Sequence, residues 1–204
     1  MKAVIDQLNR VMRMIPAWSI YVCGLSYAAW LLWLGISNQL GADPVEALEH
    51  ALGEAGLYVM IAGLSVTPLR RYLGLNLMKF RRALGLTCFF FIAMHLLVWA
   101  ILDVQQLSAV LADLTKRPYI MVGMAGFLLM VPLAITSNNM SVRRLGANWR
   151  SLHKLTYLAA ILGGAHYLML VKGIQVKPIF IMFVIVSLLG VRYVTSRTSR
   201  PSRI

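Results

Sequence analysis

The chain has 204 residues, of which 59% are hydrophobic and only 13% charged, and its formal net charge is +13. Soluble domains contain about 25% charged residues, so this composition excludes an ordinary soluble domain and indicates a membrane protein. The positive charge does not by itself indicate nucleic acid, because in a membrane protein it first has to be compared with the topology. The two cysteines, Cys23 and Cys88, lie in separate apolar segments and are interpreted as packing residues rather than as a disulfide or a metal site.

Six apolar segments approach the roughly 20 residues that a helix needs to cross the hydrocarbon core of a bilayer. We predict spans at about 14–36, 50–69, 83–102, 119–137, 153–171 and 178–194. The connections leave almost no chain for a separate soluble domain. We therefore predict a single all-α domain over 1–204, an integral membrane protein built as a six-transmembrane helix bundle. The first segment is too long for a cleavable signal peptide and shows no small-residue cleavage site.

An even number of spans places both termini on one side of the membrane, and the basic residues indicate which side that is. Asp6 is the one acid on the side of the termini. Sixteen of the twenty basic residues fall on this same side: Lys2, Arg10, Arg13, Arg70, Arg71, Lys79, Arg81, Arg82, Arg143, Arg144, Arg150, Lys154, Arg192, Arg197, Arg200 and Arg203. The opposite side holds Lys116, Arg117, Lys172 and Lys177 with six acids, Asp43, Glu46, Glu49, Glu54, Asp103 and Asp113. Both termini are therefore predicted to be cytoplasmic. This asymmetry explains the net charge without nucleic acid and favours contact with anionic lipid headgroups.

The histidines inside the spans carry most of the functional information, because ionisable residues are costly to bury in lipid. His95 lies 13 residues after Arg82, and His166 lies 13 residues after His153. A rise of about 1.5 Å per residue places both histidines about 20 Å from the inner interface. Because the third and fifth spans run in the same direction, His95 and His166 are predicted to lie at the same depth, in the outer half of the bilayer.

Two neutral imidazoles on facing helices can supply both axial ligands of a heme iron, which suits electron transfer because no coordination position stays open. We therefore predict a heme between His95 and His166. The alternative is that such a histidine only joins two helices through a hydrogen bond. His50 is interpreted as an interfacial residue, and His153 either as a basic anchor or as the ligand of a second, inner cofactor. On an ideal helix, His153 and His166 face one cavity only if the helix is distorted.

Five segments carry a resemblance to a known family: 41–50 (GADPVEALEH), 67–71 (TPLRR), 81–86 (RRALGL), 116–119 (KRPY) and 145–157 (LGANWRSLHKLTY). Together with the pair His166 and Tyr167 they resemble the MsrQ (YedZ) family, and the likeness covers nearly the whole chain. This family is part of the ferric-reductase-like transmembrane group, with the NADPH oxidases and the STEAP proteins. The resemblance implies a multi-pass protein of the bacterial inner membrane that passes electrons to MsrP, a periplasmic molybdopterin enzyme that reduces methionine sulfoxide in oxidised envelope proteins.

The resemblance also implies cofactors and an electron donor. Family members are associated with heme b and FMN, and the donor is a cytoplasmic flavin reductase or the membrane quinone pool. The heme histidines of the family match His95, His153 and His166. The oxidase relatives hold two stacked hemes on paired histidines, but here Arg81 or Arg82 stands where the partner of the inner histidine is expected. The resemblance thus implies one outer heme and a different carrier in the inner site.

An inner carrier is also required on physical grounds, because electron transfer falls steeply with distance and the outer heme would lie about 20 Å from the inner face. We predict FMN in this inner site, with its phosphate neutralised by Arg81, Arg82 or Arg150. Ordinary positive-inside anchoring explains the same arginines equally well.

A transmembrane electron conduit with no substrate chemistry of its own is the function that these patterns favour. Five outer acids are candidates for docking the periplasmic partner, although they also fit solvated loop charges: Asp43, Glu46, Glu49, Asp103 and Asp113. Three alternatives stay open. They are a quinol-oxidising cytochrome with a quinone pocket near Trp99 or Trp149, a proton or metal-ion transporter that uses the histidines, and a structural anchor for another subunit.

Overall fold

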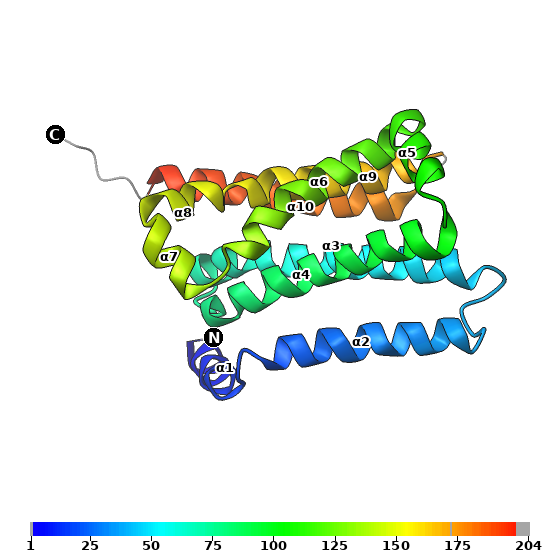
Figure 1. Cartoon of the computed structure of the whole chain (residues 1–204). Helices are drawn as coiled ribbons and strands as arrows, with labels where there is room; N and C mark the ends of the chain where they lie inside the picture. The colour runs from blue at the N-terminus through cyan, green and yellow to red at the C-terminus, as the bar shows by residue number, and fades with distance from the viewer. Residues whose placement is uncertain (1, 172, 199–204) are drawn as a thin grey trace.

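The structure, a computed structural model, describes residues 2–171 and 173–198, and over these ranges it contains helices and no strand (Figure 1). The all-α prediction is confirmed for this part of the chain. Lys172, Arg200 and Arg203, which contribute to the predicted charge asymmetry, lie outside the described residues.

The helices follow one another in the order α1 (Lys2–Met14), α2 (Ser19–Ile36), α3 (Pro44–Tyr72), η1 (Met78–Phe80), α4 (Arg81–Leu97), η2 (Val98–Asp103), α5 (Leu107–Lys116), α6 (Pro118–Ile135), α7 (Asn139–Leu145), α8 (Ala147–Leu152), α9 (Leu155–Leu170) and α10 (Val176–Thr198). Start signals in the sequence explain several of their boundaries. Asp43 caps α3 by accepting a hydrogen bond from the backbone N–H of Glu46, and α3 and α6 both have proline in the first turn.

Five segments are long and apolar enough to cross a membrane: α2, α3, the continuous stretch from Met78 to Asp103, α6, and α10 as far as Val194. They correspond to five of the six predicted spans, and they support a multi-pass membrane protein. The remaining predicted span, 153–171, corresponds to α9, whose 16 residues are fewer than the roughly 20 of a perpendicular span. That α9 crosses the bilayer and that both termini are cytoplasmic stay predictions.

The first predicted span, 14–36, begins too early. The transmembrane helix α2 starts only at Ser19, and the preceding residues form the separate helix α1. The break lies at Pro16, which has no backbone N–H and disfavours helical geometry at the residue before it. Helix α1 buries none of its residues, and its exposed apolar and basic side chains are typical of a helix that lies in the membrane interface.

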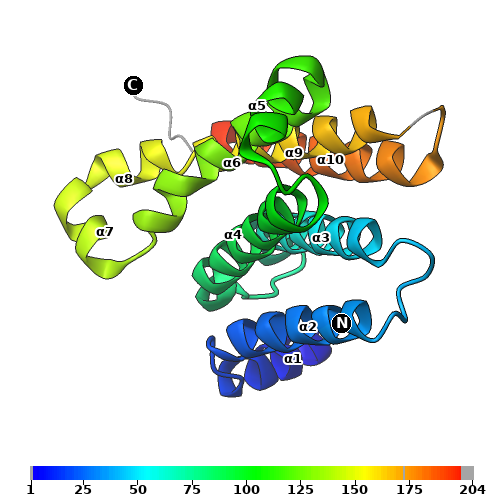
Figure 2. The ribbon, with the colours of Figure 1, turned by 45° about the vertical axis from the view of Figure 1, so that its right-hand side comes forward.

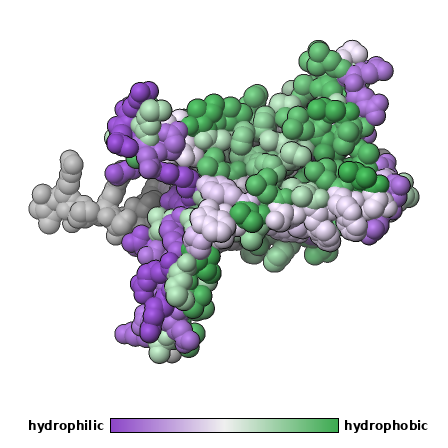
Figure 3. Space-filling view, turned by 60° about the horizontal axis from the view of Figure 1, so that its bottom comes forward, coloured by the Kyte–Doolittle hydropathy of each residue, from purple (hydrophilic) through white to green (hydrophobic). Residues whose placement is uncertain are grey.

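Different elements gather at the two ends of the bundle (Figure 1). The end that carries α1, η1, α7 and α8 is here called the basic end, and the end that carries the start of α3, η2 and α5 is called the acidic end. In Figure 3, hydrophilic side chains gather towards both ends, with a wide hydrophobic surface between them. Helices α4 and α9 both run from the basic end to the acidic end, so they are parallel, as the sequence predicted.

In Figure 2, α3 and α4 form a layer that lies between α2 on one side and a layer of α6, α9 and α10 on the other. Helix α3 lies along α4, α6 lies along α9, and α4 also contacts α6. Helix α2 covers α3 and α4 on one side, while α10 lies against α9 and α3 on the other. Small residues permit these close approaches: a Cβ atom at Gly24 would lie 2.7 Å from Cγ2 of Thr87.

Candidate functional site

A cavity of about 340 Å³ lies at the acidic end between α3, α4, α6 and α9. This volume falls within the range of small-molecule and cofactor sites. Its apolar wall includes Leu57, Ile92 and Phe127, and both His95 and His166 contribute to its lining. The structure therefore places the two predicted heme histidines in one largely apolar cavity.

His95 on α4 and His166 on α9 face each other, with ring centres 6.2 Å apart and ring planes inclined at 73°. An imidazole nitrogen binds a metal ion at about 2 Å, so two imidazole nitrogens on opposite sides of one ion lie about 4 Å apart. The centres of the two rings are then further apart than the nitrogens by about one ring diameter. The observed separation leaves room for one metal ion between the rings. Residues 71 positions apart in the sequence thus meet in a ligand geometry.

The hydrogen bonds of the two imidazoles fix which nitrogen is free. Nδ1–H of His95 donates to the backbone carbonyl of Glu49 at 2.9 Å, and Nδ1–H of His166 donates to the backbone carbonyl of Tyr119 at 2.7 Å. A carbonyl oxygen only accepts, so in the neutral imidazole the proton is on Nδ1 and the lone pair is on Nε2. This arrangement is typical of metal-binding histidines, whose second nitrogen donates to a backbone carbonyl.

Glycines make room for both rings. A Cβ atom at Gly53 of α3 would lie 3.1 Å from Nδ1 of His95, and a Cβ atom at Gly123 of α6 would lie 2.7 Å from Nδ1 of His166. Real Cβ atoms essentially never make contacts as short as the second of these. Each imidazole therefore lies against the bare backbone of a neighbouring helix, which also supplies the carbonyl that holds it.

The helix that carries His95 changes form directly after it. Residues Val98–Asp103 adopt a π-helix, and Trp99 within it is buried and lines the cavity. Wider turns of this kind inside α-helices often occur at functional sites. Trp99 thus lines the same cavity as the histidine pair, whereas the quinone pocket considered near Trp99 or Trp149 stays a prediction.

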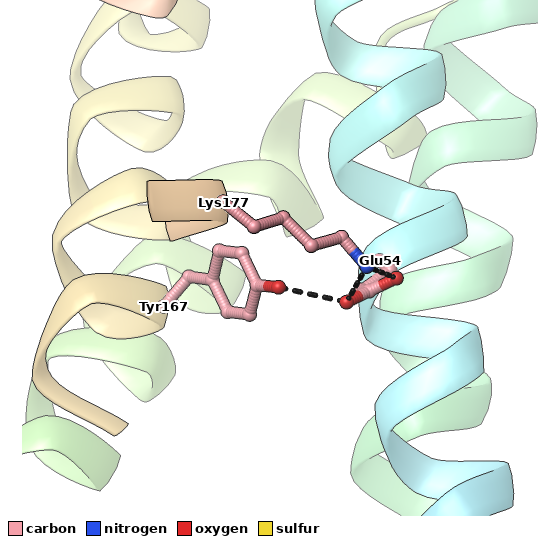
Figure 4. A network of polar contacts seen from close by, with 3 residues as sticks. All are labelled: Glu54, Tyr167 and Lys177. Atoms are coloured by element: carbon pink, nitrogen blue, oxygen red, sulfur yellow. Dashed lines mark hydrogen bonds and ion pairs between the residues drawn. The ribbon is translucent and has the colours of Figure 1, made fainter. Parts of the chain in front are cut away.

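A polar network joins three helices beside this cavity (Figure 4). The hydroxyl of Tyr167 donates to Oε1 of Glu54 at 2.7 Å, and the ammonium of Lys177 lies 2.6 Å from each carboxylate oxygen of Glu54. Glu54 and Tyr167 line the cavity, whereas Lys177 approaches from α10. One carboxylate next to the histidine pair is thus held by two donors from other helices.

Four of the five predicted docking acids border the opening of the cavity: Asp43, Glu46, Glu49 and Asp103. The fifth, Asp113, instead forms an ion pair at 3.2 Å with Arg117, which also lines the opening. His50 borders the same opening and is exposed, in agreement with its interpretation as an interfacial residue.

A second cavity, of about 570 Å³, lies at the basic end. None of the described residues that line it is acidic. Five cationic residues line it: Arg81, Arg82, Arg150, Lys154 and Arg192. Such a cavity favours an anionic ligand. The three arginines that the sequence assigned to an inner carrier therefore lie around one cavity.

His153 lines the basic-end cavity, in the turn between α8 and α9. Its Nε2 lies 3.0 Å from Oγ1 of Thr136, whose own proton goes to the carbonyl of Pro132 at 2.6 Å, so Nε2 of His153 is the donor. The ring stacks on Trp149 at 4.0 Å between centres. Burial and the nearby charge of Arg81 lower the pKa of His153. His153 and His166 therefore face different cavities, and Nε2 of His153 is engaged, unlike that of His95.

Sequence reasoning missed the residues that orient the two facing histidines and one member of the basic-end cavity. The glycines and carbonyls have no distinctive spacing, so they were visible only as ordinary residues of apolar helices. Arg192 was counted only as a topology marker, yet it is 8% exposed, donates to Oγ1 of Thr67 at 2.7 Å and lies over the ring of Tyr157. Its position two residues inside the end of the last predicted span was the available signal.

The described residues contain no group of three or more His, Cys, Asp and Glu side chains placed to hold a metal ion. His50 and the carboxylates that line the acidic-end cavity are therefore not placed to complete a metal site with His95 and His166, so a metal ion between these two imidazoles has to bring its remaining ligands with it. A porphyrin does so, which distinguishes this site from a bare-metal site.

Comparisons with known proteins agree with this chemistry. A family model described as ferric reductase like transmembrane component matches residues 50–164. The chain is 45% identical over 178 residues to a protein of Agrobacterium fabrum named protein-methionine-sulfoxide reductase heme-binding subunit MsrQ, which covers 87% of this chain and 83% of the relative. It is 44% identical over 173 residues to proteins of the same name from Brucella ovis and Brucella canis, with 84% of this chain and 79% of each relative covered.

Proposed function

Because the chain belongs to the ferric-reductase-like transmembrane family, and within it to the MsrQ heme-binding subunits of protein-methionine-sulfoxide reductase, we propose that it is a transmembrane electron-transfer cytochrome b. It receives electrons at the basic end from a cytoplasmic flavin reductase or from membrane quinone. It delivers them at the acidic end to a periplasmic molybdopterin methionine sulfoxide reductase of the MsrP type, in support of the repair of oxidised envelope proteins. It is a subunit of an oxidoreductase system and transforms no substrate of its own.

The observation that carries the proposal is the pair of facing imidazoles, His95 and His166, each with Nδ1 held by a carbonyl and Nε2 free. A heme between them supplies reversible one-electron chemistry without an open coordination position. The residues around the cavity fit such a group, because Gly53 and Gly123 leave space for the rings and the wall is mainly apolar. The chain's part is to fix both imidazoles and to exclude water from the site.

The inner carrier belongs to the basic-end cavity, and we assign FMN to it. A phosphate group there meets Arg81, Arg82 and Arg150, whose planar guanidinium groups suit phosphate oxygens. The stacked rings of Trp149 and His153 offer a flat aromatic surface in the same cavity, which suits an isoalloxazine ring. In this assignment His153 belongs to the inner carrier and not to the outer heme.

The orientation follows from the charge of the two ends. We assign the basic end to the cytoplasm and the acidic end to the periplasm of an inner-membrane protein, since cytoplasmic loops are enriched in Lys and Arg. The acids at the opening of the outer cavity then face the periplasmic partner, where they steer the encounter with a basic surface. The hydrophobic surface between the two ends, seen in Figure 3, then contacts the lipid bilayer.

A pigment analysis of the purified protein tests this function. We expect about one heme b per chain and a reduced-minus-oxidised difference spectrum of a six-coordinate, low-spin cytochrome. Reduction should proceed through flavin reductase, NADH and FMN, and transfer to the periplasmic reductase should reoxidise the heme. A colourless preparation would rule out the proposal. Reduction by quinol at the same rate without flavin would identify membrane quinone as the donor, and such reduction without transfer to the periplasmic reductase would identify a quinol-oxidising cytochrome for another partner.

The FMN assignment leads to a separate prediction. Replacing Arg81 or Arg150 by glutamine should weaken FMN binding about tenfold each, because each loses a charge-assisted hydrogen bond to the phosphate. Heme content should stay at the wild-type level. FMN affinity is measured by fluorescence quenching in detergent, with Arg144→Gln as the control, because Arg144 is a basic residue of α7 that does not line the cavity. Equal affinities in all three variants would exclude this cavity as the flavin site.

A further inference from the structure

Two members of the network in Figure 4, Glu54 and Tyr167, are sequence neighbours of residues that contact or carry the two imidazoles. Glu54 directly follows Gly53, the residue of α3 against which the ring of His95 lies. Tyr167 directly follows His166 on α9. The hydrogen bond between Tyr167 and Glu54 therefore links the wall behind one imidazole to the helix that carries the other.

This link matters because α3 and α9 make few other direct contacts. Helix α9 lies mainly along α6 and α10, and α3 lies mainly along α4. The 2.7 Å hydrogen bond and the ion pair of Lys177 thus join the α3–α4 pair to the α9–α10 pair beside the cavity. Because α10 also packs directly against α3, this side-chain bridge adds to the helix packing and fixes the spacing of α3 and α9 locally, beside the two imidazoles.

The network also contributes to the charge beside the cavity. The Glu54 side chain is 26% exposed and borders the apolar cavity, so its negative charge is only partly screened there. Lys177 lies within hydrogen-bond distance of both carboxylate oxygens and offsets this charge. An unbalanced carboxylate beside a heme stabilises the oxidised iron, which carries one more positive charge than the reduced iron, and so lowers the reduction potential.

We propose that Glu54, Tyr167 and Lys177 form a positioning and charge-balancing network that sets the spacing of the His95–His166 pair and the reduction potential of the heme between them. This inference rests on the proposed function. In it, Tyr167 positions His166 through Glu54, Glu54 provides the negative charge, and Lys177 offsets that charge. The hydrogen bonds of the three residues join them to one another and not to the imidazoles, so they act through the helix positions and through the electric field.

The test is a spectroelectrochemical titration of the full-length protein in detergent. Replacing Lys177 by glutamine leaves the Glu54 charge unbalanced and should lower the one-electron reduction constant about tenfold, or about 59 mV. Glu54→Gln removes the negative charge and should raise the constant by a similar factor. The double variant should return towards the wild-type potential. Because the charges are partly exposed, both single shifts should shrink as salt is added.

Position and charge are separated by two further variants. Glu54→Asp keeps the charge and should keep a near wild-type potential. Tyr167→Phe keeps all charges but loses the bridging hydrogen bond, so we expect a small shift in potential and a broadened low-spin electron paramagnetic resonance signal from less uniform ring orientations. Tyr72→Phe, at an exposed tyrosine at the opposite end of α3, is the matched control and should change neither readout.

The outcomes distinguish this inference from the function on which it rests. Absence of heme from the wild-type protein would remove the proposed function itself. With heme present in the wild type, shifts of the same sign in Glu54→Gln and Lys177→Gln, or shifts no larger than that of Tyr72→Phe, would overturn the network. Loss of heme from Glu54→Gln but not from Glu54→Asp would support it, whereas loss from both would count against it.

Discussion

Replacing His95 or His166 by alanine is expected to reduce bound heme to at most about a tenth of the wild-type amount, since even loss of a residue that only supports a ligand costs about 10–100-fold in metal affinity. Each alanine removes one of two imidazoles that face each other at 6.2 Å and leaves the other without a partner. The remaining imidazole cannot hold the iron in a six-coordinate, low-spin state alone. Electron delivery to the periplasmic reductase should be lost with the heme.

Heme content per chain and the absorption spectrum measure this effect, with protein amount and thermal stability recorded for each variant. His50→Ala is the control, because His50 is an exposed histidine at the opening of the same cavity and is assigned no ligand role. Any small residual heme in His95→Ala should be high-spin. A six-coordinate, low-spin spectrum that persists in the double variant of His95 and His166 would show that the iron has other ligands.

The position of the histidine pair was predictable from the sequence because it depends on the hydropathy pattern and on the regular geometry of α-helices. Hydropathy gave the helices, the rise per residue gave the depth, and the direction of the spans made α4 and α9 parallel. Two histidines at equal distances from basic interface residues could therefore be placed together. Their ligand role itself is still a prediction, which the variants above test.

The environment of the pair was not predictable, because it depends on contacts between residues far apart in the sequence. Gly123 and the carbonyl of Tyr119 approach His166 from α6, and no local pattern announces this. The break at Pro16 was visible in the sequence, but the long apolar segment around it concealed the boundary between α1 and α2. The hydrogen bond of His153 to Thr136 likewise depends on how α6 and the α8–α9 turn pack together.

The glycine beside His166 is expected to be almost as important as the ligand itself. In Gly123→Ala, the new methyl group would lie 2.7 Å from Nδ1 and 3.0 Å from Cε1 of His166, so the ring has to move. The ring then loses its bond to the carbonyl of Tyr119, and Nε2 no longer points at the metal position. Since supporting contacts of metal-bound histidines are worth about 10–100-fold in affinity, we expect heme binding to fall by a similar factor.

A graded series of alanine variants tests this steric explanation. Gly53→Ala should have a smaller effect, because its Cβ would lie 3.1 Å from Nδ1 of His95, a contact that a shift of a few tenths of an ångström relieves. Gly190→Ala is the control, because nothing lies within 4 Å of a Cβ atom at that position of α10. Heme affinity should therefore decrease in the order Gly190→Ala, Gly53→Ala, Gly123→Ala. If Gly123→Ala binds heme as tightly as Gly190→Ala, His166 is not held against α6 when the heme is bound, and the ligand geometry derived from its Nδ1 hydrogen bond is wrong.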